Sequence, residues 1–440
     1  MYNDIYFQRG FDIVKVSIYT LGCKVNQYES RIMEQDFITY GYEIVPFADK
    51  SDVVVIHTCA VTEESARKSR QIMRRAKKLN PNAVIVVVGC LVQTSCSDIF
   101  PQADVLVGNR QKRELPAFVG QFLQTGIRVE AVHSIHNVAF EPMCLTHDEH
   151  TRAMVKVQDG CNNFCSYCII PYARGRIRSK KIEEAVMEIT ELVQNGYKEI
   201  VLTGIHLDSY GKDIGTYTLC DLILKVNEIP GIERIRLSSL EPVFITQENL
   251  SIIAVADKLC HHFHLSLQSG CTKTLRNMNR RYTAELYAQS VQRLRQIYAD
   301  VSLTTDVIVG FPGESDRDFE DSLQFVKNIG FSKVHVFPFS PRRGTKAYEM
   351  GGQIATEVKK ERCARMLQVS YESEQAFLQN LYGKTLDVLF EQERAGMYAG
   401  YTGNYAQVRV NSAVDIRNKI IPVRITGVME DYCIGDLQNS

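Results

Sequence analysis

Three cysteines in one short loop are the residues of this chain best suited to chemistry. Residues 155–171 read VKVQDGCNNFCSYCIIP, in which Cys161, Cys165 and Cys168 follow the pattern C-x3-C-x2-C. Thiolates at this spacing can bind an iron–sulfur cube, which takes four ligands when it is closed. Because the loop offers only three thiolates, one iron keeps an open position that the amino and carboxylate groups of a small molecule can occupy.

Zinc and unrelated buried thiols are the two alternatives for this loop. Structural zinc usually takes four Cys or His ligands in paired units, and no second pair lies near the loop in the sequence. An apolar segment, Ala153–Val157, leads directly into it, as expected where a βα-barrel presents its chemistry at the C-terminal ends of its strands. The pattern therefore favours an iron–sulfur site.

A second group of cysteines follows three apolar runs of the type found in parallel strands that are covered on both faces. The runs and their cysteines are Val14–Tyr19 with Cys23, Val53–Ile56 with Cys59, and Ala83–Val88 with Cys90. Open α/β sheets bind ligands at the C-terminal ends of such strands. Free cysteines are also common as small buried residues, but a cysteine after each of three strands favours a second three-ligand iron–sulfur site. Cys96 is a weaker candidate for the third position.

Length and composition limit the class of protein. A chain of 440 residues is expected to form about three domains. Its 51 basic and 51 acidic residues cancel, so total charge neither favours nor excludes a nucleic-acid partner. Thirteen cysteines are too sparse for a disulfide scaffold, which favours a reducing compartment. Since the longest apolar run, Ala83–Val92, is shorter than the ~20 residues that span a bilayer, we expect a cytoplasmic protein without a membrane partner.

The elements that must position these cysteines predict an α/β fold in three parts. Residues 12–130 alternate strands and helices as in a doubly wound α/β domain, and 131–150 are a linker. Residues 151–375 continue as a (βα) barrel with a helical connector, and 376–440 form a small all-β barrel. The strands expected in the two barrels are Met154–Val157, Glu199–Thr203, Arg234–Leu237, Phe263–Leu267, Ser302–Val309 and Lys333–Phe337, then Thr385–Phe390, Met397–Tyr401, Ala406–Val410 and Ile420–Val428.

Glycine-rich or polar turns follow three of the expected barrel strands, at the rim that the cysteine loop shares. Each turn alone is a weak signal, because any tight turn gives the same pattern. Together they predict a pocket for a small-molecule cofactor. The residues assigned to this pocket are Tyr167, Gly204, His206, Gln268, Gly310 and Gly313.

Basic and aromatic residues provide possible contacts with nucleic acid. The segment Arg67–Lys78 carries seven positive charges, which either form a solvated helix face or contact RNA. Further basic residues follow barrel strands and could bind phosphates. In the C-terminal barrel, Tyr398, Tyr401 and Tyr405 are candidates for stacking on bases. The basic residues expected around the barrel mouth are Arg174, Arg176, Arg178, Lys180, Lys181, Arg280, Arg281, Arg342, Arg343 and Lys346.

With these motifs in place, the chain resembles the radical S-adenosylmethionine (SAM) methylthiotransferases along nearly its whole length. That family has an N-terminal cluster domain, a radical-SAM barrel and a C-terminal TRAM domain, in this order. The N-terminal motifs are Thr20–Ser30 (TLGCKVNQYES), Thr58–Thr62 (TCAVT) and Val88–Cys90 (VGC). The sequence of Gly22–Asn26 (GCKVN) resembles the corresponding motif of the branch that acts on N6-threonylcarbamoyladenosine at position 37 of tRNA. His57 stands where the family more often has asparagine.

The resemblance implies a radical-SAM tRNA methylthiotransferase with two [4Fe-4S] clusters and SAM as cofactors. One SAM would methylate a sulfur held at the Cys23/Cys59/Cys90 cluster. Another would be cleaved at the Cys161/Cys165/Cys168 cluster to a radical that takes hydrogen from C2 of the adenine, where the methylthio group is inserted. The implied partners are the anticodon arm of tRNA around A37, and an electron donor and a sulfur donor of unspecified identity.

Other substrates and one other class of protein stay open at this point. Isopentenyladenosine in tRNA and a ribosomal protein are the alternative substrates within the same family. A non-catalytic, zinc-dependent RNA-binding protein is the remote alternative, because it would need neither iron nor SAM.

Overall fold

The computed structural model describes residues 13–95, 97–136, 138–146 and 151–438, so Cys96 lies outside the described residues. The chain divides into two compact units. Unit 1 contains residues up to Leu145 together with Ile169–Arg176, and unit 2 contains Thr146–Cys168 with Ile177 to the end. A short helix that directly follows Cys168 in sequence therefore belongs to the N-terminal unit.

Unit 1 is built on a six-stranded parallel sheet with the order β2-β1-β3-β4-β5-β6. Its strands are β1 (Lys15–Thr20), β2 (Glu43–Ile44), β3 (Val53–Thr58), β4 (Val84–Gly89), β5 (Val105–Val107) and β6 (Val129–Ala131). Its helices are α1 (Lys24–Thr39), α2 (Glu63–Leu79), α3 (Cys90–Gln93), α4 (Leu115–Thr125) and α5 (Ile170–Arg174), with 3-10 turns η1 (Ser97–Ile99) and η2 (Lys112–Glu114).

The helices of unit 1 cover both faces of this sheet. Val54 and Ile56 of β3 pack with Met73 of α2 on one face. Their neighbours Val53 and Val55 pack on the other face with residues of α1 and α4. Because successive side chains of a strand point to opposite faces, the continuous apolar run of β3 is what a doubly wound sheet requires. The predicted doubly wound domain is confirmed, with β2, β5 and β6 as short strands that the sequence pattern missed.

Unit 2 begins with two three-stranded parallel sheets, β11-β10-β7 and β12-β13-β14. Bridges Ile235↔Leu259 and Leu240↔Leu265 join them in the order β7-β10-β11-β12-β13-β14, which is a partial (βα) barrel as predicted. The strands are β7 (Arg152–Lys156), β10 (Glu199–Thr203), β11 (Arg234–Leu237), β12 (His262–His264), β13 (Ser302–Val309) and β14 (Lys333–Pro338), with a small hairpin-like pair of β8 (Gln158–Asp159) and β9 (Arg178–Ser179).

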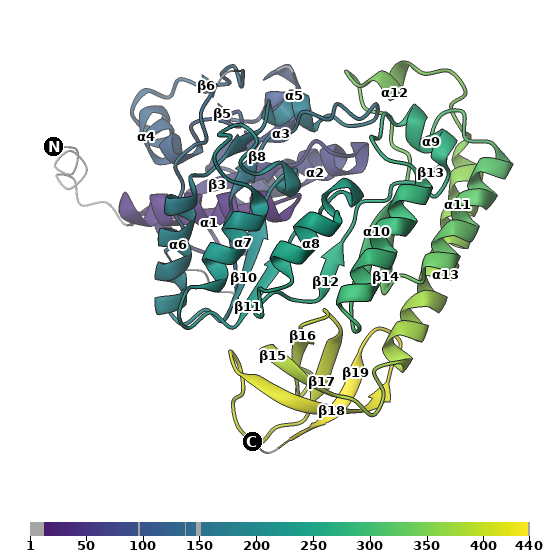
Figure 1. Cartoon of the computed structure of the whole chain (residues 1–440). Helices are drawn as coiled ribbons and strands as arrows, with labels where there is room; N and C mark the ends of the chain where they lie inside the picture. The colour runs from purple at the N-terminus through teal and green to yellow at the C-terminus, as the bar shows by residue number, and fades with distance from the viewer. Residues whose placement is uncertain (1–12, 96, 137, 147–150, 439–440) are drawn as a thin grey trace. The chain divides into compact units, whose positions relative to one another are not determined.

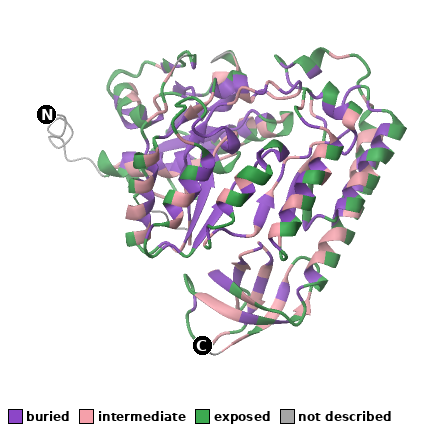
Figure 2. Cartoon of the chain, in the orientation of Figure 1, coloured by how far each residue is buried: buried purple, intermediate pink, exposed green. Residues whose placement is uncertain are grey.

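Helices alternate with the barrel strands and have exposed outer faces, whereas the strands are mostly buried, except for the largely exposed β14 (Figure 2). These helices are α6 (Ile182–Gln194), α7 (Leu219–Asn227), α8 (Gln247–Ile253), α9 (Thr272–Asn277), α10 (Ala284–Ile297), α11 (Asp316–Ile329) and α12 (Lys346–Glu349), with 3-10 turns η3 (Leu207–Ser209) and η4 (Pro242–Phe244). The long helix α13 (Thr356–Gln379) then packs along β14 and leads into the C-terminal strands (Figure 1).

The C-terminal strands form a closed barrel with the order β15-β16-β17-β19-β18. The strands are β15 (Thr385–Arg394), β16 (Met397–Thr402), β17 (Gln407–Val410), β18 (Ile420–Val428) and β19 (Cys433–Leu437), of which β19 was not expected from the sequence. Alternate residues such as Val388 and Phe390 point into its core. The predicted small all-β barrel is thus confirmed.

Each helix among the described residues is too short or too polar to span a lipid bilayer.

Three arginines attach the small barrel to the N-terminal ends of the (βα) barrel strands. Arg236 of β11 is buried, binds Glu199 at 2.7 Å, donates to the carbonyl of Gly403 at 3.0 Å and lies over the Tyr405 ring. Arg234 donates to the carbonyls of Tyr401 and Asp387. The third arginine, Arg152 of β7, pairs with Glu391 at 2.6 Å.

The tyrosines at this junction are already engaged within the protein. Tyr405 stacks on Tyr401 at 4.9 Å and on His262 at 4.7 Å, and Arg152 lies over both tyrosine rings. Both rings already pack on other groups of the protein, which does not favour stacking of Tyr401 or Tyr405 on an RNA base, and such stacking stays a prediction. Tyr398 packs against the core of the small barrel.

We predict that Arg236→Leu loosens the junction between the two barrels. The substitution leaves the carboxylate of Glu199, 0% exposed, without its closest partner, and breaking a buried ion pair costs roughly 3–5 kcal/mol. Amide exchange in residues 401–405 should then accelerate by about 100-fold or more. Arg417→Leu removes an exposed arginine that pairs with Asp415 and should leave this exchange unchanged. Equal exchange in both variants would contradict the assigned role of Arg236.

Candidate metal centres

Unit 1 places its three predicted cysteine ligands at one edge of its sheet. Cys23 precedes α1, Cys59 follows β3, and Cys90 begins α3 directly after β4. Because β1, β3 and β4 are neighbours, with Thr20 aligned to His57 and Thr58 aligned to Gly89, the three cysteines come from adjacent strand ends. Burial raises the pKa of the Cys59 thiol, and the neighbouring thiols of Cys90 and Cys23 raise it further. The structure thus brings together the triad that the sequence predicted.

Two glycines let the backbone approach closely at these strand ends. Gly22 has φ +109°, and a Cβ at this position would lie 2.8 Å from the side-chain nitrogen of Asn26 and 3.1 Å from Cβ of Cys59. Gly89 has φ +107°, and a Cβ there would lie 2.8 Å from the ring of His57. A side chain at either position would meet both steric overlap and an unfavourable φ. The glycines before Cys23 and Cys90 are therefore required by the packing of the triad.

A buried network of charges lies behind the triad, centred on Glu29. The carboxylate of Glu29 accepts hydrogen bonds from Lys112 at 2.7 Å and from Arg174 at 2.9 and 3.0 Å. Arg174 also donates to Asn26 at 2.7 Å, and Asn26 donates to the carbonyls of Leu21 and Thr58. The side chains of Glu29, Lys112 and Arg174 are each 1% exposed. One buried carboxylate thus faces two buried cationic side chains, which leaves a net positive charge near the thiols.

His57, which stands where the family more often has asparagine, takes part in the same network. The ring is fully buried in β3, with Nδ1 2.9 Å from the hydroxyl of Ser30 and Nε2 3.6 Å from Glu29. Thr20 in turn donates to Ser30 at 2.7 Å. The histidine therefore fits the site as a packed polar residue behind the triad, and it leaves the three sulfur ligands in place.

The sulfur atoms themselves have donors that suit thiolates. The side-chain nitrogen of Asn109, just after β5, lies 3.3 Å from Sγ of Cys90 and 2.7 Å from the carbonyl of Ala173. Burial raises the pKa of the Cys59 thiol to about 11, although a hydrogen bond from the backbone of Val61 acts in the opposite direction. A metal centre would supply the positive charge that keeps such a thiol ionised.

In unit 2 the second triad lies in the loop after β8. Gly160 has φ +72°, and the loop then carries Cys161, Cys165 and Cys168. The amide of Asn163 points to Sγ of Cys161 at 3.4 Å, and a guanidinium nitrogen of Arg280 lies 3.2 Å from Sγ of Cys165. Burial raises the pKa of Cys161 to about 11. Positively charged and N–H groups are therefore aimed at these sulfurs as well.

Polar side chains from other strand ends surround this cysteine loop. Arg280 pairs with Glu241 at 2.9 Å, and Glu241 accepts from Asn163 at 2.8 Å. Nε2 of His206 lies 3.3 Å from both Asn163 and Asp208. Burial lowers the pKa of His206, but Asp208 and Glu241 raise it to about 9 overall, so the ring is protonated at neutral pH. The structure thus brings the predicted His206 to the cysteine loop.

Asp208 is the clearest sign that this site receives a further group. Both of its carboxylate oxygens are buried, and Oδ1 lies 3.3 Å from Nε2 of His206, but among the residues that the structure describes neither oxygen makes a hydrogen bond of accepted geometry. Nδ1 of His206 is also buried and, in the part of the chain that the structure describes, makes no hydrogen bond. Buried polar atoms are normally hydrogen-bonded, so a ligand with donor groups fits this position. Sequence reasoning missed Asp208, Glu241 and Asn163 because polar residues in turns carry no distinctive pattern.

The remaining residues assigned to the cofactor pocket lie in the loops that follow barrel strands, or in the cysteine loop in the case of Tyr167. Gly204 follows β10, and a Cβ there would lie 2.8 Å from the side-chain oxygen of Gln158. Gln268 has φ +67° and donates its amide to the carbonyl of Asp306. The amides of Gly310 and Gly313 bind Glu314 and Gly352. The Tyr167 ring packs edge-on against Phe311 at 6.5 Å. Their contact with a cofactor remains a prediction.

The basic residues expected at the barrel mouth divide into two groups. Arg174 is buried against Glu29, Lys180 is buried against Glu188, and Arg342 is also buried. Arg178 and Arg280 form internal ion pairs with Asp159 and Glu241. The expectation that these five contact phosphate is wrong, because each is buried or engaged in an internal ion pair. The exposed members are Arg176, Lys181, Arg281, Arg343 and Lys346.

The spacing of the cysteines suits a cluster better than a single ion. Two sulfurs on one tetrahedral zinc lie about 3.8 Å apart, given Zn–S bonds of about 2.3 Å. Among the described residues, the groups that bring three ligand atoms within 4.8 Å contain histidines and carboxylates and no cysteine. Neither cysteine triad is among these groups, and cationic and N–H donors lie beside the sulfurs, which favours an iron–sulfur cluster over a single zinc ion.

Comparison with known proteins agrees with this geometry. Residues 155–326 match the radical SAM superfamily, and residues 15–108 match the uncharacterized protein family UPF0004. The second match spans the cysteine triad of unit 1, and the first spans the cysteine triad of unit 2. Each triad therefore lies in a segment with recognised relatives.

Solved structures support the fold alone. The radical S-adenosylmethionine methyltransferase TsrM from Kitasatospora setae, with cobalamin and a [4Fe-4S] cluster bound, aligns with 13% identity and a TM-score of 0.54, covering 77% of this chain and 74% of that chain. The cobalamin-dependent S-adenosylmethionine radical enzyme OxsB aligns with 11% identity and a TM-score of 0.52, covering 81% of this chain and 56% of that chain.

Curated relatives extend over nearly the whole sequence. The threonylcarbamoyladenosine tRNA methylthiotransferase MtaB of Bacillus subtilis is 39% identical over 93% of both chains, and that of Aquifex aeolicus is 39% identical over 90% of this chain and 96% of its own. A tRNA-2-methylthio-N(6)-dimethylallyladenosine synthase of Caldicellulosiruptor saccharolyticus is 34% identical over 99% and 95%. With two cysteine triads in the segments that these comparisons recognise, this chain belongs to the radical-SAM tRNA methylthiotransferases, in the threonylcarbamoyladenosine branch.

Proposed function

We propose that this protein inserts a methylthio group at C2 of N6-threonylcarbamoyladenosine at position 37 of tRNA. The observation that carries the proposal is the presence of two separate cysteine triads, one in each unit, in a chain that is 39% identical to threonylcarbamoyladenosine tRNA methylthiotransferases. The relatives named for dimethylallyladenosine are less similar, at 32–34%. This difference favours the threonylcarbamoyl substrate.

Unit 2 provides the residues for SAM and one [4Fe-4S] cluster, the cofactors of the radical SAM superfamily. Cys161, Cys165 and Cys168 would hold the cluster, which supplies the electron for reductive cleavage of SAM. Asp208 offers buried acceptors for the cationic amino group of SAM, and Arg280 lies beside Cys165 with its charge toward the sulfur. An adenine C–H has no acidic proton, so the work of these residues is to bind, orient and exclude water.

Unit 1 would hold a second [4Fe-4S] cluster, on Cys23, Cys59 and Cys90. Thiolates bound to iron carry negative charge into a buried site, where uncompensated charge is costly. The net positive charge of Lys112, Arg174 and Glu29 offsets it. In this proposal the second site presents the sulfur that is transferred, and the exposed Cys23 lies on its accessible side.

We predict that turnover depends on the threonylcarbamoyl group. Cluster-loaded protein, SAM and reductant should convert tRNA that carries N6-threonylcarbamoyladenosine and leave the same tRNA without that modification unchanged. Mass spectrometry of the digested nucleosides measures the product. Equal turnover on both tRNAs would remove the threonylcarbamoyl assignment, and turnover restricted to isopentenyladenosine tRNA would support the alternative substrate.

The two triads are predicted to bind iron independently. Reconstituted wild-type protein should contain about eight irons per chain, and replacing Cys161, Cys165 and Cys168 together with alanine should leave about four. Replacing Cys23, Cys59 and Cys90 instead should leave SAM cleavage to 5′-deoxyadenosine intact and abolish methylthiolation. Loss of all iron in either triple variant would contradict two independent sites.

Arg174 is predicted to act as a positioning residue for the unit 1 triad. Arg174→Met removes one of the two cationic side chains from the site, while Glu29 keeps its hydrogen bond from Lys112. Iron should fall toward about four per chain, and methylthiolation should be lost while 5′-deoxyadenosine still forms. Arg174→Lys should recover part of both, because it restores the charge.

The matched control for this variant is Arg176→Met, which changes an exposed arginine two positions later. It should keep full iron content. If Arg174→Met also keeps full iron content, the buried charge network is not needed to hold the second cluster.

A further inference from the structure

A face of the second barrel sheet carries polar residues that the proposed chemistry does not use. In the parallel ladder, His264 of β12 is aligned with Thr304 of β13, and Asp306 two residues later is aligned with His335 of β14. Aligned residues and residues two apart point to the same face. The four side chains therefore project from one face of the sheet, while Leu303, Thr305 and Val307 between them are buried on the other.

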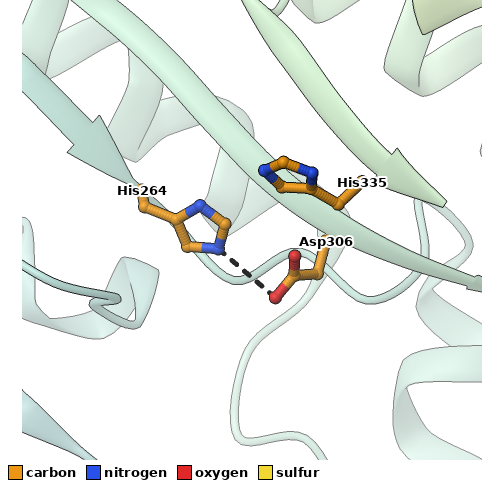
Figure 3. A group of neighbouring side chains, drawn as sticks. All are labelled: His264, Asp306 and His335. Carbon is orange, nitrogen blue, oxygen red and sulfur yellow. Dashed lines mark ion pairs between the residues drawn. The ribbon is translucent and has the colours of Figure 1, made fainter. Parts of the chain in front are cut away.

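Three of these side chains converge on one point (Figure 3). Each of His264, Asp306 and His335 places one ligand atom within 4.8 Å of the other two. Nε2 of His264 is 3.3 Å from a carboxylate oxygen of Asp306, and the two imidazole rings stack with centroids 6.0 Å apart. The side chains of His264 and Asp306 are 15% and 32% exposed, and His335 is exposed. The group is therefore partly enclosed but open on the His335 side.

The orientation of His264 is fixed from behind by Thr304. The hydroxyl of Thr304 lies 3.0 Å from Nδ1 of His264 and 3.0 Å from Nε2 of His262. If Nδ1–H of His264 donates to the hydroxyl and the hydroxyl donates to His262, both contacts are satisfied. Nε2 of His264 then presents a lone pair toward Asp306. Histidines that bind metals are held in this way, through a hydrogen bond at the other ring nitrogen.

With this tautomer, a lone pair on Nε2 faces the carboxylate of Asp306, which is unfavourable unless a cation lies between them. Among the described residues, Nε2 of His264 is buried and makes no hydrogen bond of acceptable geometry, although Asp306 is near. A proton on Nε2 would bridge only His264 and Asp306, whereas a metal ion would bind His264, Asp306 and His335. Two histidines and one carboxylate form a ligand set typical of zinc and of other divalent first-row metals.

We propose that His264, Asp306 and His335 form a binding site for a divalent transition-metal ion, separate from both cysteine triads. The site takes one ligand from each of three adjacent parallel strands. Its open side lies toward His335, where a water molecule or an oxygen group of a bound molecule completes the coordination. The inference does not depend on the proposed substrate, since it concerns residues outside the cluster loops.

The test uses cluster-loaded, full-length protein and Zn²⁺ as the probe. After equilibration with buffered zinc, iron and zinc are measured in the same sample by plasma mass spectrometry. Wild-type protein should bind about one zinc per chain at full iron content. His264→Ala, Asp306→Asn and His335→Ala should each weaken zinc binding by about 10-fold or more, and Thr304→Val should weaken it by about 10- to 100-fold.

His261→Ala is the matched control, because this exposed histidine pairs with Asp300 nearby and has no third ligand. It should bind zinc as the wild type does. Zinc-edge X-ray absorption should show imidazole nitrogen in the first shell, reduced in His264→Ala. Zinc bound through sulfur, equal binding by all five variants, or no zinc in cluster-loaded wild type would overturn the proposal. The iron content and the tRNA product of the wild type are unaffected by these outcomes and test the proposed function separately.

Discussion

The gathering of three cysteine sulfurs, some of them buried, at one place is the constraint on which the two metal centres depend. Burial favours the neutral thiol, as the raised pKa values of Cys59 and Cys161 show. The structure opposes this with cations and N–H donors placed beside the sulfurs. In unit 1 these are Asn109 and the network of Arg174, and in unit 2 Arg280 lies against Cys165. The iron of a bound cluster would supply the remaining positive charge.

In unit 2 the residues proposed for catalysis and the residues that contact the small barrel lie at opposite ends of the (βα) barrel strands. The cysteine loop, His206 and Glu241 follow the C-terminal ends of strands, where parallel barrels present their reactive groups. The N-terminal ends carry Arg152 and Arg236, whose contacts hold the closed β-barrel in place.

Charge and aromatic residues were the least informative parts of the sequence. Arg174 and Arg280 belonged to a basic set that resembled a phosphate-binding rim, yet both are partners of buried or nearly buried acids. Tyr401 and Tyr405 resembled base-stacking residues, yet they stack on each other and beneath Arg152. A charged or aromatic side chain has the same appearance in a sequence whether its partner is solvent, RNA or another part of the chain. Only the fold identifies the partner.

The sequence by itself determined the two cysteine triads, the alternation of strands and helices, and the change to short strands after the connector helix. These features are local: a loop spacing, an apolar run that ends in cysteine, and turn residues are all read within a few positions. The ion pairs of Glu29 could not be predicted in this way, because its partners Lys112 and Arg174 are 83 and 145 residues away in the sequence. His264, Asp306 and His335 also meet only because β12, β13 and β14 are adjacent in the sheet. Strand order and register bring such distant residues together, and tertiary structure alone decides them.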